Sequence, residues 1–228
     1  SIDLTSDLHP NDLVAVDLDG DGLKDLATAN NYSTIGSPAS ISLFRNTSSK
    51  ANPAFARRIN YNSGVLTYAI AAGDFDKDGK PDLVSSTIRD NSIIVYKNTS
   101  TLGAIELAQG MYFIGTGSIY DIAIADMDGD GRQDIATINA LENTLSVYLN
   151  TSTGVGSISF APRVNFTTGL FPNSLAVADF DKDGKPDVVV SNQMESSVSL
   201  FRNTSQPGAL NFTPKLDFPL PTGTTSYG

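Results

Sequence analysis

The sequence contains no cysteine, a single histidine and no apolar run long enough to span a membrane. The lack of cysteine excludes disulfides and thiolate metal sites. His9 stands beside Pro10 in an expected loop, where a lone histidine is ordinarily a surface residue. No segment shows helical periodicity. We therefore expect an all-β protein without membrane insertion, in which the usual residues of acid–base catalysis are scarce.

Four copies of one acidic loop dominate what remains. Each has aspartate at positions 1, 3, 5 and 9 and glycine at position 6, and the loops cover residues 17–25, 74–82, 126–134 and 179–187. A loop wrapped around an ion directs alternate side chains inward, and the sharp turn at position 6 favours a residue without a Cβ. The pattern predicts about four Ca²⁺ ions per chain.

The predicted ligands are the four aspartates of each loop and the carbonyl oxygen of its seventh residue. They are Asp17, Asp19, Asp21, Leu23 and Asp25; Asp74, Asp76, Asp78, Lys80 and Asp82; Asp126, Asp128, Asp130, Arg132 and Asp134; and Asp179, Asp181, Asp183, Lys185 and Asp187.

Two alternatives for these loops are weaker. A single Asp-x-Asp-Gly is often only a turn, but four copies in one register disfavour that interpretation. An EF-hand begins in the same way and needs a bidentate glutamate at position 12, where this chain has Thr28, Ser85, Thr137 and Val190. The flanking segments also read as strands, which argues against EF-hand and dockerin-like helices.

The net charge of −10 is explained by the same loops. They supply 16 of the 25 acidic residues, and four bound Ca²⁺ would bring the net charge to about −2. The acidity therefore indicates metal binding and says little about partners. Nucleic acid is not an expected partner, because no basic stripe interleaved with aromatics is present.

The loops mark a repeat. They begin at residues 17, 74, 126 and 179, and a period near 50 residues is typical of a propeller or solenoid. Each repeat is expected to hold four short strands, which is the content of one propeller blade. Within residues 1–228, taken as one repeat region, the blades cover approximately 13–61, 69–113, 122–166 and 175–218. The expected fourth strands are 55–61, 107–113, 160–166 and 212–218.

The Asp-x-Asp-x-Asp-Gly-x-x-Asp loops and the blade-like strands resemble the FG-GAP/VCBS repeat family, whose calcium-binding blades also occur in the integrin α-subunit propeller. The match is weaker at the tripeptides that name the family, where Phe113-Ile-Gly115 is nearest to Phe-Gly. That difference places the chain nearer to the bacterial VCBS-like branch, so integrin-type ligand recognition is not carried over. The resemblance implies a structural metal, in a loop that joins the first strand to the second.

The ends leave the number of blades open. Residues 1–12 align with the end of a preceding blade, and residue 228 follows a complete fourth strand. Two interpretations remain, a closed four-bladed ring and a segment of a larger ring, and the family most often forms about seven blades. The ends favour the segment, as a mature chain or as part of a longer one, with further propeller repeats, another chain or a neighbouring domain as its partner.

Composition and resemblance together predict a calcium-binding propeller module of a secreted or cell-surface bacterial protein. Its expected role is non-catalytic adhesion or recognition of an extracellular carbohydrate or protein ligand. One alternative is the propeller part of a secreted polysaccharide-degrading enzyme, and another is a structural spacer or assembly module. Aromatics expected opposite the metal loops, Tyr32, Tyr68, Tyr120 and Phe171, would either contact a ligand or pack between blades. The recurring Asn-Thr-Ser triplets are interpreted as turns rather than as glycosylation sites.

Overall fold

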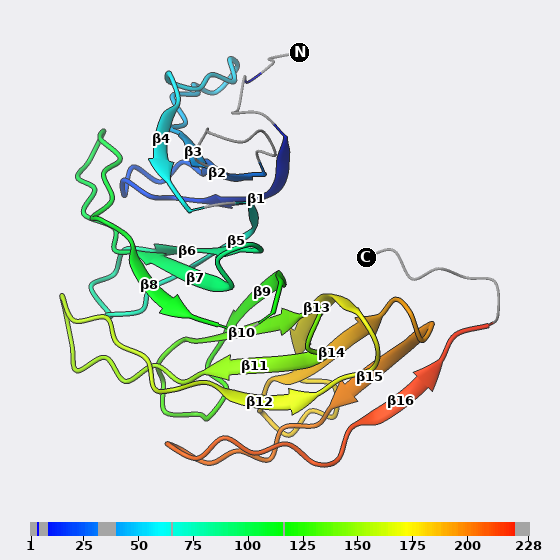
Figure 1. Ribbon diagram of the computed structural model, residues 1–228. Coiled ribbons are helices and arrows are strands. Elements are labelled where there is room, and N and C mark those ends of the chain that lie inside the picture. The colour runs from blue at the N-terminus through cyan, green and yellow to red at the C-terminus, as the bar shows by residue number, and fades with distance from the viewer. Residues whose placement is uncertain (1–3, 5–8, 32–39, 65, 116, 222–228) are drawn as a thin grey trace. The chain divides into compact units, whose positions relative to one another are not determined.

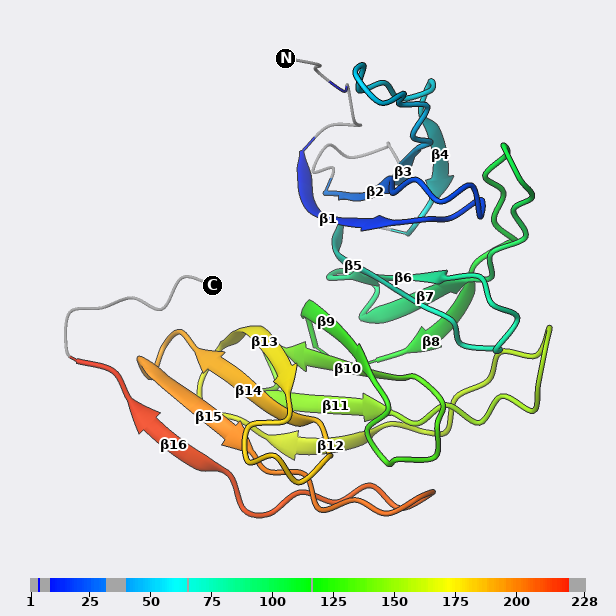
Figure 2. The ribbon, with the colours of Figure 1, turned by 180° about the vertical axis from the view of Figure 1, so that it is seen from behind.

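The computed structural model describes residue 4 and residues 9–31, 40–64, 66–115 and 117–221. These residues form sixteen strands in four separate antiparallel sheets, each with its strands side by side in chain order (Figures 1 and 2). The expected all-β fold of four-stranded blades is confirmed. In the described part of the chain, no helix is long and apolar enough to cross a membrane.

The strands follow the four repeats. The first sheet holds β1 Pro10–Val16, β2 Asp25–Asn30, β3 Ser40–Phe44 and β4 Ile59–Asn62, and the second holds β5 Thr67–Gly73, β6 Asp82–Thr87, β7 Ser92–Tyr96 and β8 Met111–Ile114. The third sheet holds β9 Ile119–Ala125, β10 Asp134–Asn139, β11 Thr144–Tyr148 and β12 Val164–Thr167, and the fourth holds β13 Pro172–Ala178, β14 Asp187–Asn192, β15 Ser197–Phe201 and β16 Leu216–Pro219.

The fourth strand of every repeat begins later than the sequence predicted. The phenylalanine or leucine expected to open it makes only an isolated bridge to the asparagine of Asn-Thr-Ser, and the regular strand starts four residues further on. The intervening residues include Gly110, Pro162 and Pro214. A Cβ on Gly110 would lie 2.5 Å from Cγ2 of Ile94, and a proline cannot donate to the ladder. Close packing at Gly110 and proline therefore interrupt the strand in the last three repeats.

The chain divides into two compact units, each holding two sheets. One comprises residues 1–74 and 79–115, the other residues 75–78 and 116–228. In the first unit β1 packs beside β5, and Asp12 Oδ2 accepts a hydrogen bond from the backbone N–H of Ile70 at 2.9 Å. In the second unit β9 packs beside β13, and Asp121 Oδ2 accepts one from the N–H of Leu175 at 2.9 Å. An aspartate at the equivalent position thus joins the two sheets of each unit.

Each unit has its own apolar core between its sheets. In the first three sheets the two middle strands are buried along almost their whole length. In the first unit the core includes Leu18, Ile41, Leu43, Ile94, Tyr96 and Leu107; in the second it includes Met127, Ile138, Val147, Val190, Phe201 and Phe212.

The asparagine of each Asn-Thr-Ser triplet makes a turn, and Asn203 also links two sheets. In the fourth repeat Asn203 Oδ1 accepts a hydrogen bond from the N–H of Ser205 at 2.8 Å, which is an Asx turn. Its Nδ2 donates to the carbonyl of Pro186 at 2.9 Å and to the carbonyl of Met127, in the third repeat, at 2.8 Å. The same Asx turn occurs at the triplets that begin with Asn46, Asn98 and Asn150. The interpretation of the triplets as turns is confirmed.

This arrangement predicts a large effect of Asn203→Ala. Asn203 is fully buried, so the variant leaves two carbonyls without a donor and should lower the free energy of unfolding by about 2–3 kcal/mol. The matched control is Asn46→Ala, because Asn46 is partly exposed and donates to Lys24 alone in the described part of the chain; there we expect a loss of about 1 kcal/mol or less. Urea unfolding of both variants measures the difference, and equal losses would show that the bond to Met127 contributes nothing.

Candidate metal centres

Each acidic loop connects the first strand of a sheet to the second. The glycine at position 6 has a left-handed backbone in all four, with φ of 87° at Gly22, 83° at Gly79, 82° at Gly131 and 87° at Gly184. A Cβ on Gly22 would meet no atom within 4 Å. Glycine is therefore required by the backbone conformation and not by lack of space.

Backbone N–H groups hold the first aspartate of the loop in place. Asp17 accepts hydrogen bonds from the N–H of Gly20 and of Gly22, both at 2.8 Å. Asp126 makes the equivalent pair with Gly129 at 2.8 Å and Gly131 at 2.7 Å. Asp126 Oδ1 also accepts the N–H of Asp130 at 3.1 Å. These bonds orient the first carboxylate of the loop, and in Asp17 they use one acceptor position on each oxygen, which leaves further lone pairs for a cation.

The aspartate at position 9 is the most buried member of the loop. Asp25 is 0% exposed and accepts hydrogen bonds from the N–H of Leu18 and of Asn46, both at 2.8 Å. Asp134 does the same with Met127 and Asn150, both at 2.7 Å. The position 9 carboxylate therefore accepts hydrogen bonds from the second residue of its own loop and from the asparagine just after the third strand.

The structure brings oxygen atoms of three aspartates in each loop within 4.8 Å of one another. The groups are Asp17, Asp19 and Asp25; Asp74, Asp76 and Asp78; Asp126, Asp128 and Asp134; and Asp179, Asp181 and Asp187. The remaining predicted aspartates, Asp21, Asp82, Asp130 and Asp183, lie outside these groups. At position 7, Leu23, Arg132 and Lys185 donate their N–H to the carboxylate at position 5. Coordination by the position 7 carbonyls of Leu23, Lys80, Arg132 and Lys185 stays a prediction.

Electrostatics in the third loop favour a cation. Burial, together with the charges of Asp128 and Asp130, raises the pKa of Asp134 to about 7, against the lowering effect of the backbone N–H groups of Asn150 and Met127. Burial likewise raises the pKa of Asp25. A divalent cation among these oxygens would favour the ionised carboxylates. An all-oxygen set of donors around one point fits a hard cation such as Ca²⁺.

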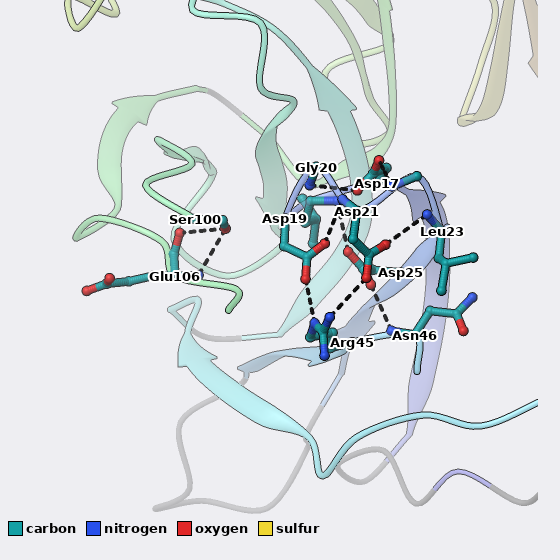
Figure 3. A network of polar contacts seen from close by, with 12 residues as sticks. Asp17, Asp19, Gly20, Asp21, Leu23, Asp25, Arg45, Asn46, Ser100 and Glu106 are labelled. Atoms are coloured by element: carbon teal, nitrogen blue, oxygen red, sulfur yellow. Dashed lines mark hydrogen bonds and ion pairs between the residues drawn. The ribbon is translucent and has the colours of Figure 1, made fainter. Parts of the chain in front are cut away.

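Besides Arg132, whose guanidinium pairs with Asp130 in the third loop, two arginines that the sequence analysis did not single out contact the loops. Arg45, just after the third strand, forms an ion pair with Asp19, and its Nη2 lies 2.9 Å from Oδ2 of Asp21. Figure 3 shows the guanidinium facing both carboxylates. Arg202 forms the equivalent ion pair with Asp181, and its Nη2 lies 3.3 Å from Oδ2 of Asp183. The signal in the sequence is Phe-Arg-Asn-Thr-Ser in the first and fourth repeats, where the second and third have Lys97 and Leu149.

One pair of the aromatics expected opposite the metal loops has a packing role. The rings of Tyr120 and Phe171 lie edge to face, with centroids 5.6 Å apart. This contact joins the third and fourth repeats and favours the packing interpretation for both residues. Tyr32 lies outside the described residues.

Comparison with known proteins agrees with this architecture. FG-GAP-like repeats match residues 17–85, 74–137 and 126–190, and each match runs from one acidic loop through the next. Integrin alpha pat-2 of Caenorhabditis briggsae is 28% identical over 160 residues, covering 57% of this chain and 13% of that protein. A propeller-like crystal structure of a Lactobacillus plantarum protein superposes with a TM-score of 0.62 at 15% identity, covering 96% of this chain and 58% of that one.

The chain therefore spans only part of the length of each of these proteins. The matched repeats run without a gap from residue 17 to residue 190, which is more than half of the chain. On the strength of that match, the chain belongs to the FG-GAP-like repeat family.

Proposed function

We propose that this chain is a calcium-binding β-propeller module that binds about four Ca²⁺ ions, one in each acidic loop. The observation that carries the proposal is the recurrence of a cluster of three aspartates, with a left-handed glycine at position 6, in all four repeats. The aspartates at positions 1, 3, 5 and 9 are the proposed side-chain ligands, and the carbonyl at position 7 adds a main-chain ligand. A bound ion would supply positive charge among carboxylates that otherwise repel one another.

The proposed role of the ion is structural. The position 9 aspartates are buried and bonded to the third strand through Asn46, Asn98, Asn150 and Asn203. An ion at the loop would therefore stiffen the connection between three strands of the same sheet. Binding free energy gained only in the folded state adds directly to stability.

The proposed biological role is non-catalytic recognition outside the cell. FG-GAP-like and integrin-like repeats are typically non-catalytic and extracellular, and the similarity to an integrin α-subunit supports an adhesive role. We place the parent protein at the surface of a bacterium or among its secreted proteins. The ligand is an extracellular carbohydrate or protein.

Calcium dependence is the first test. Thermal unfolding in excess EDTA and then in millimolar Ca²⁺ should show a large upward shift, with about four ions per chain by elemental analysis. The variant Asp126→Ala/Asp130→Ala should bind one ion fewer and show a smaller shift. The control Glu106→Gln/Glu195→Gln removes two exposed carboxylates outside the loops, and it should leave both the number of bound ions and the thermal shift unchanged. An unchanged ion count in the loop variant would contradict the site.

The recognition role has a separate test. The chain, in Ca²⁺ and in EDTA, is applied to arrays of polysaccharides and of extracellular-matrix proteins. The proposal expects a signal above background on at least one probe in Ca²⁺, lost or reduced in EDTA. Background signal on every probe, from a chain that binds four ions, would leave calcium binding intact and favour a spacer role instead.

The two arginines predict that the loops differ in affinity. Each guanidinium carries the same sign of charge as Ca²⁺ and lies beside candidate ligand carboxylates, so it should weaken Ca²⁺ binding by about tenfold. Arg45→Leu/Arg202→Leu, which introduces the leucine of the third repeat, should tighten two sites by about that factor. It should also destabilise the metal-free chain, because the carboxylates lose their counter-charge.

A chelator-competition titration measures these affinities. Arg57→Leu removes an exposed arginine elsewhere and is the control. Unchanged or weaker binding in the double variant would mean that the arginines orient the carboxylates more than they repel the ion.

A further inference from the structure

One buried asparagine bonds to both the third and the fourth acidic loops. Asn203 is 0% exposed, and its Nδ2 donates to the carbonyl of Met127 at 2.8 Å. Met127 stands between Asp126 and Asp128, two candidate ligands of the third loop. The backbone N–H of Asn203 donates to Oδ1 of Asp187, a candidate ligand of the fourth loop, at 2.7 Å. All of these residues belong to the second compact unit.

The segment that begins at Asn203 makes a second bond to the third loop. Oδ2 of Asp128 accepts the N–H of Gly208 at 2.7 Å, while its Oδ1 accepts the N–H of Asp130 at 3.1 Å. Each bond uses one lone pair of an oxygen and leaves another for a cation. Asp128 can therefore ligate an ion and hold the fourth repeat at the same time. We call residues 203–208 the bridging segment.

The fourth loop holds the bridging segment from its other side. Asp187 is 1% exposed, and its Oδ2 accepts the N–H of Phe180, the second residue of the fourth loop, at 3.1 Å. Its other oxygen accepts the N–H of Asn203. Fixing Asp187 in a metal centre would therefore also fix the backbone of Asn203. The bridging segment is thus ordered by the ligand-bearing parts of two loops.

The same pair of bonds occurs in the first compact unit. Nδ2 of Asn98 donates to the carbonyl of Leu18 at 2.9 Å, and its backbone N–H donates to Oδ1 of Asp82 at 2.8 Å. Asn98 is 1% exposed and Asp82 is 0% exposed. In both units, a buried asparagine joins the second residue of one loop to the ninth residue of the next loop.

We propose that the third and fourth loops bind Ca²⁺ with positive cooperativity, and that Asn203 is the positioning residue that couples them. This inference rests on the proposed calcium binding and deepens it. A filled third loop holds Met127 and Asp128 in place, and through them the bridging segment and Asp187. The fourth loop then loses less conformational entropy when it binds its own ion, which raises its affinity. Coupling between two sites typically changes affinity by about 5- to 150-fold.

A tryptophan reporter measures the occupancy of the fourth loop separately from the others. The chain has no tryptophan. Phe180 stands between Asp179 and Asp181 and is 52% exposed, so Phe180→Trp places an indole beside the fourth loop without filling a packed core. Its fluorescence, followed during a Ca²⁺ titration, gives the dissociation constant of that loop.

The coupling is measured by disabling the third loop in the reporter chain. Asp126→Ala/Asp130→Ala should weaken Ca²⁺ binding at the fourth loop by at least about fivefold. Titration in about 1 M KCl, where the Debye length is about 3 Å, suppresses the direct effect of the two lost charges. The matched control, Asp17→Ala/Asp21→Ala, disables the first loop in the other unit and should leave the dissociation constant unchanged.

The outcomes separate this inference from the proposed function. An unchanged dissociation constant in the third-loop variant overturns the coupling and leaves calcium binding intact. Equal weakening by the first-loop and third-loop variants also overturns it, because the effect would then not pass through the bridging segment. If the reporter chain shows no fluorescence change and binds no Ca²⁺ by elemental analysis, the proposed function fails and the coupling fails with it.

Asn203→Ala tests whether the asparagine carries the coupling. It keeps the backbone N–H that bonds Asp187 and removes the amide that bonds Met127. In this variant, disabling the third loop should weaken the fourth by less than about twofold, as for independent sites. Asn46→Ala removes an equivalent Asx turn and a bond to Lys24 in the first unit, and it should leave the full effect. An undiminished effect with Asn203→Ala, in a chain that circular dichroism shows to be folded, contradicts the role of Asn203.

Discussion

The aspartate at position 9 is the interaction on which the rest of each repeat depends. Asp25, Asp82, Asp134 and Asp187 are at most 1% exposed, and each accepts the N–H of the asparagine that ends the third strand. Such charge-assisted bonds are short and about twice as strong as neutral ones, which offsets part of the cost of burying a carboxylate. The asparagine is thereby positioned to make its Asx turn and, in the later repeats, to reach the preceding loop.

The candidate metal ligands therefore lie among the same few residues that pack between sheets. Met127 stands between the metal-ligand candidates Asp126 and Asp128, and its carbonyl and side chain are covered by the following sheet. A change in the loop backbone would move the candidate ligands and the packed residue together. This coupling gives a physical reason why the sequence of the loop is more regular than that of any strand: the loop presents candidate metal ligands on one side and packs against a neighbouring sheet on the other.

Much of the architecture could be predicted from the sequence because it rests on local patterns. The loops, the left-handed glycines and the strands beside them follow from spacing within a dozen residues. In the second repeat the late start of the fourth strand could not, because it depends on the approach of Gly110 to Ile94 on the neighbouring strand of the sheet. Arg45 was missed for a similar reason, since it stands 20 residues after the loop that it contacts.

The repeats also differ in a way that only the structure explains. Asp12 and Asp121 join the first strands of neighbouring sheets, and the corresponding residues of the second and fourth repeats are Ala69 and Ser174, which have no carboxylate. The carboxylate thus occurs in alternate repeats, and these are the repeats that open the two compact units. In a chain of repeats, stability is a sum of terms within repeats and terms between neighbours. The alternation strengthens the neighbour term inside each unit, so the physical building block of this chain is a pair of repeats.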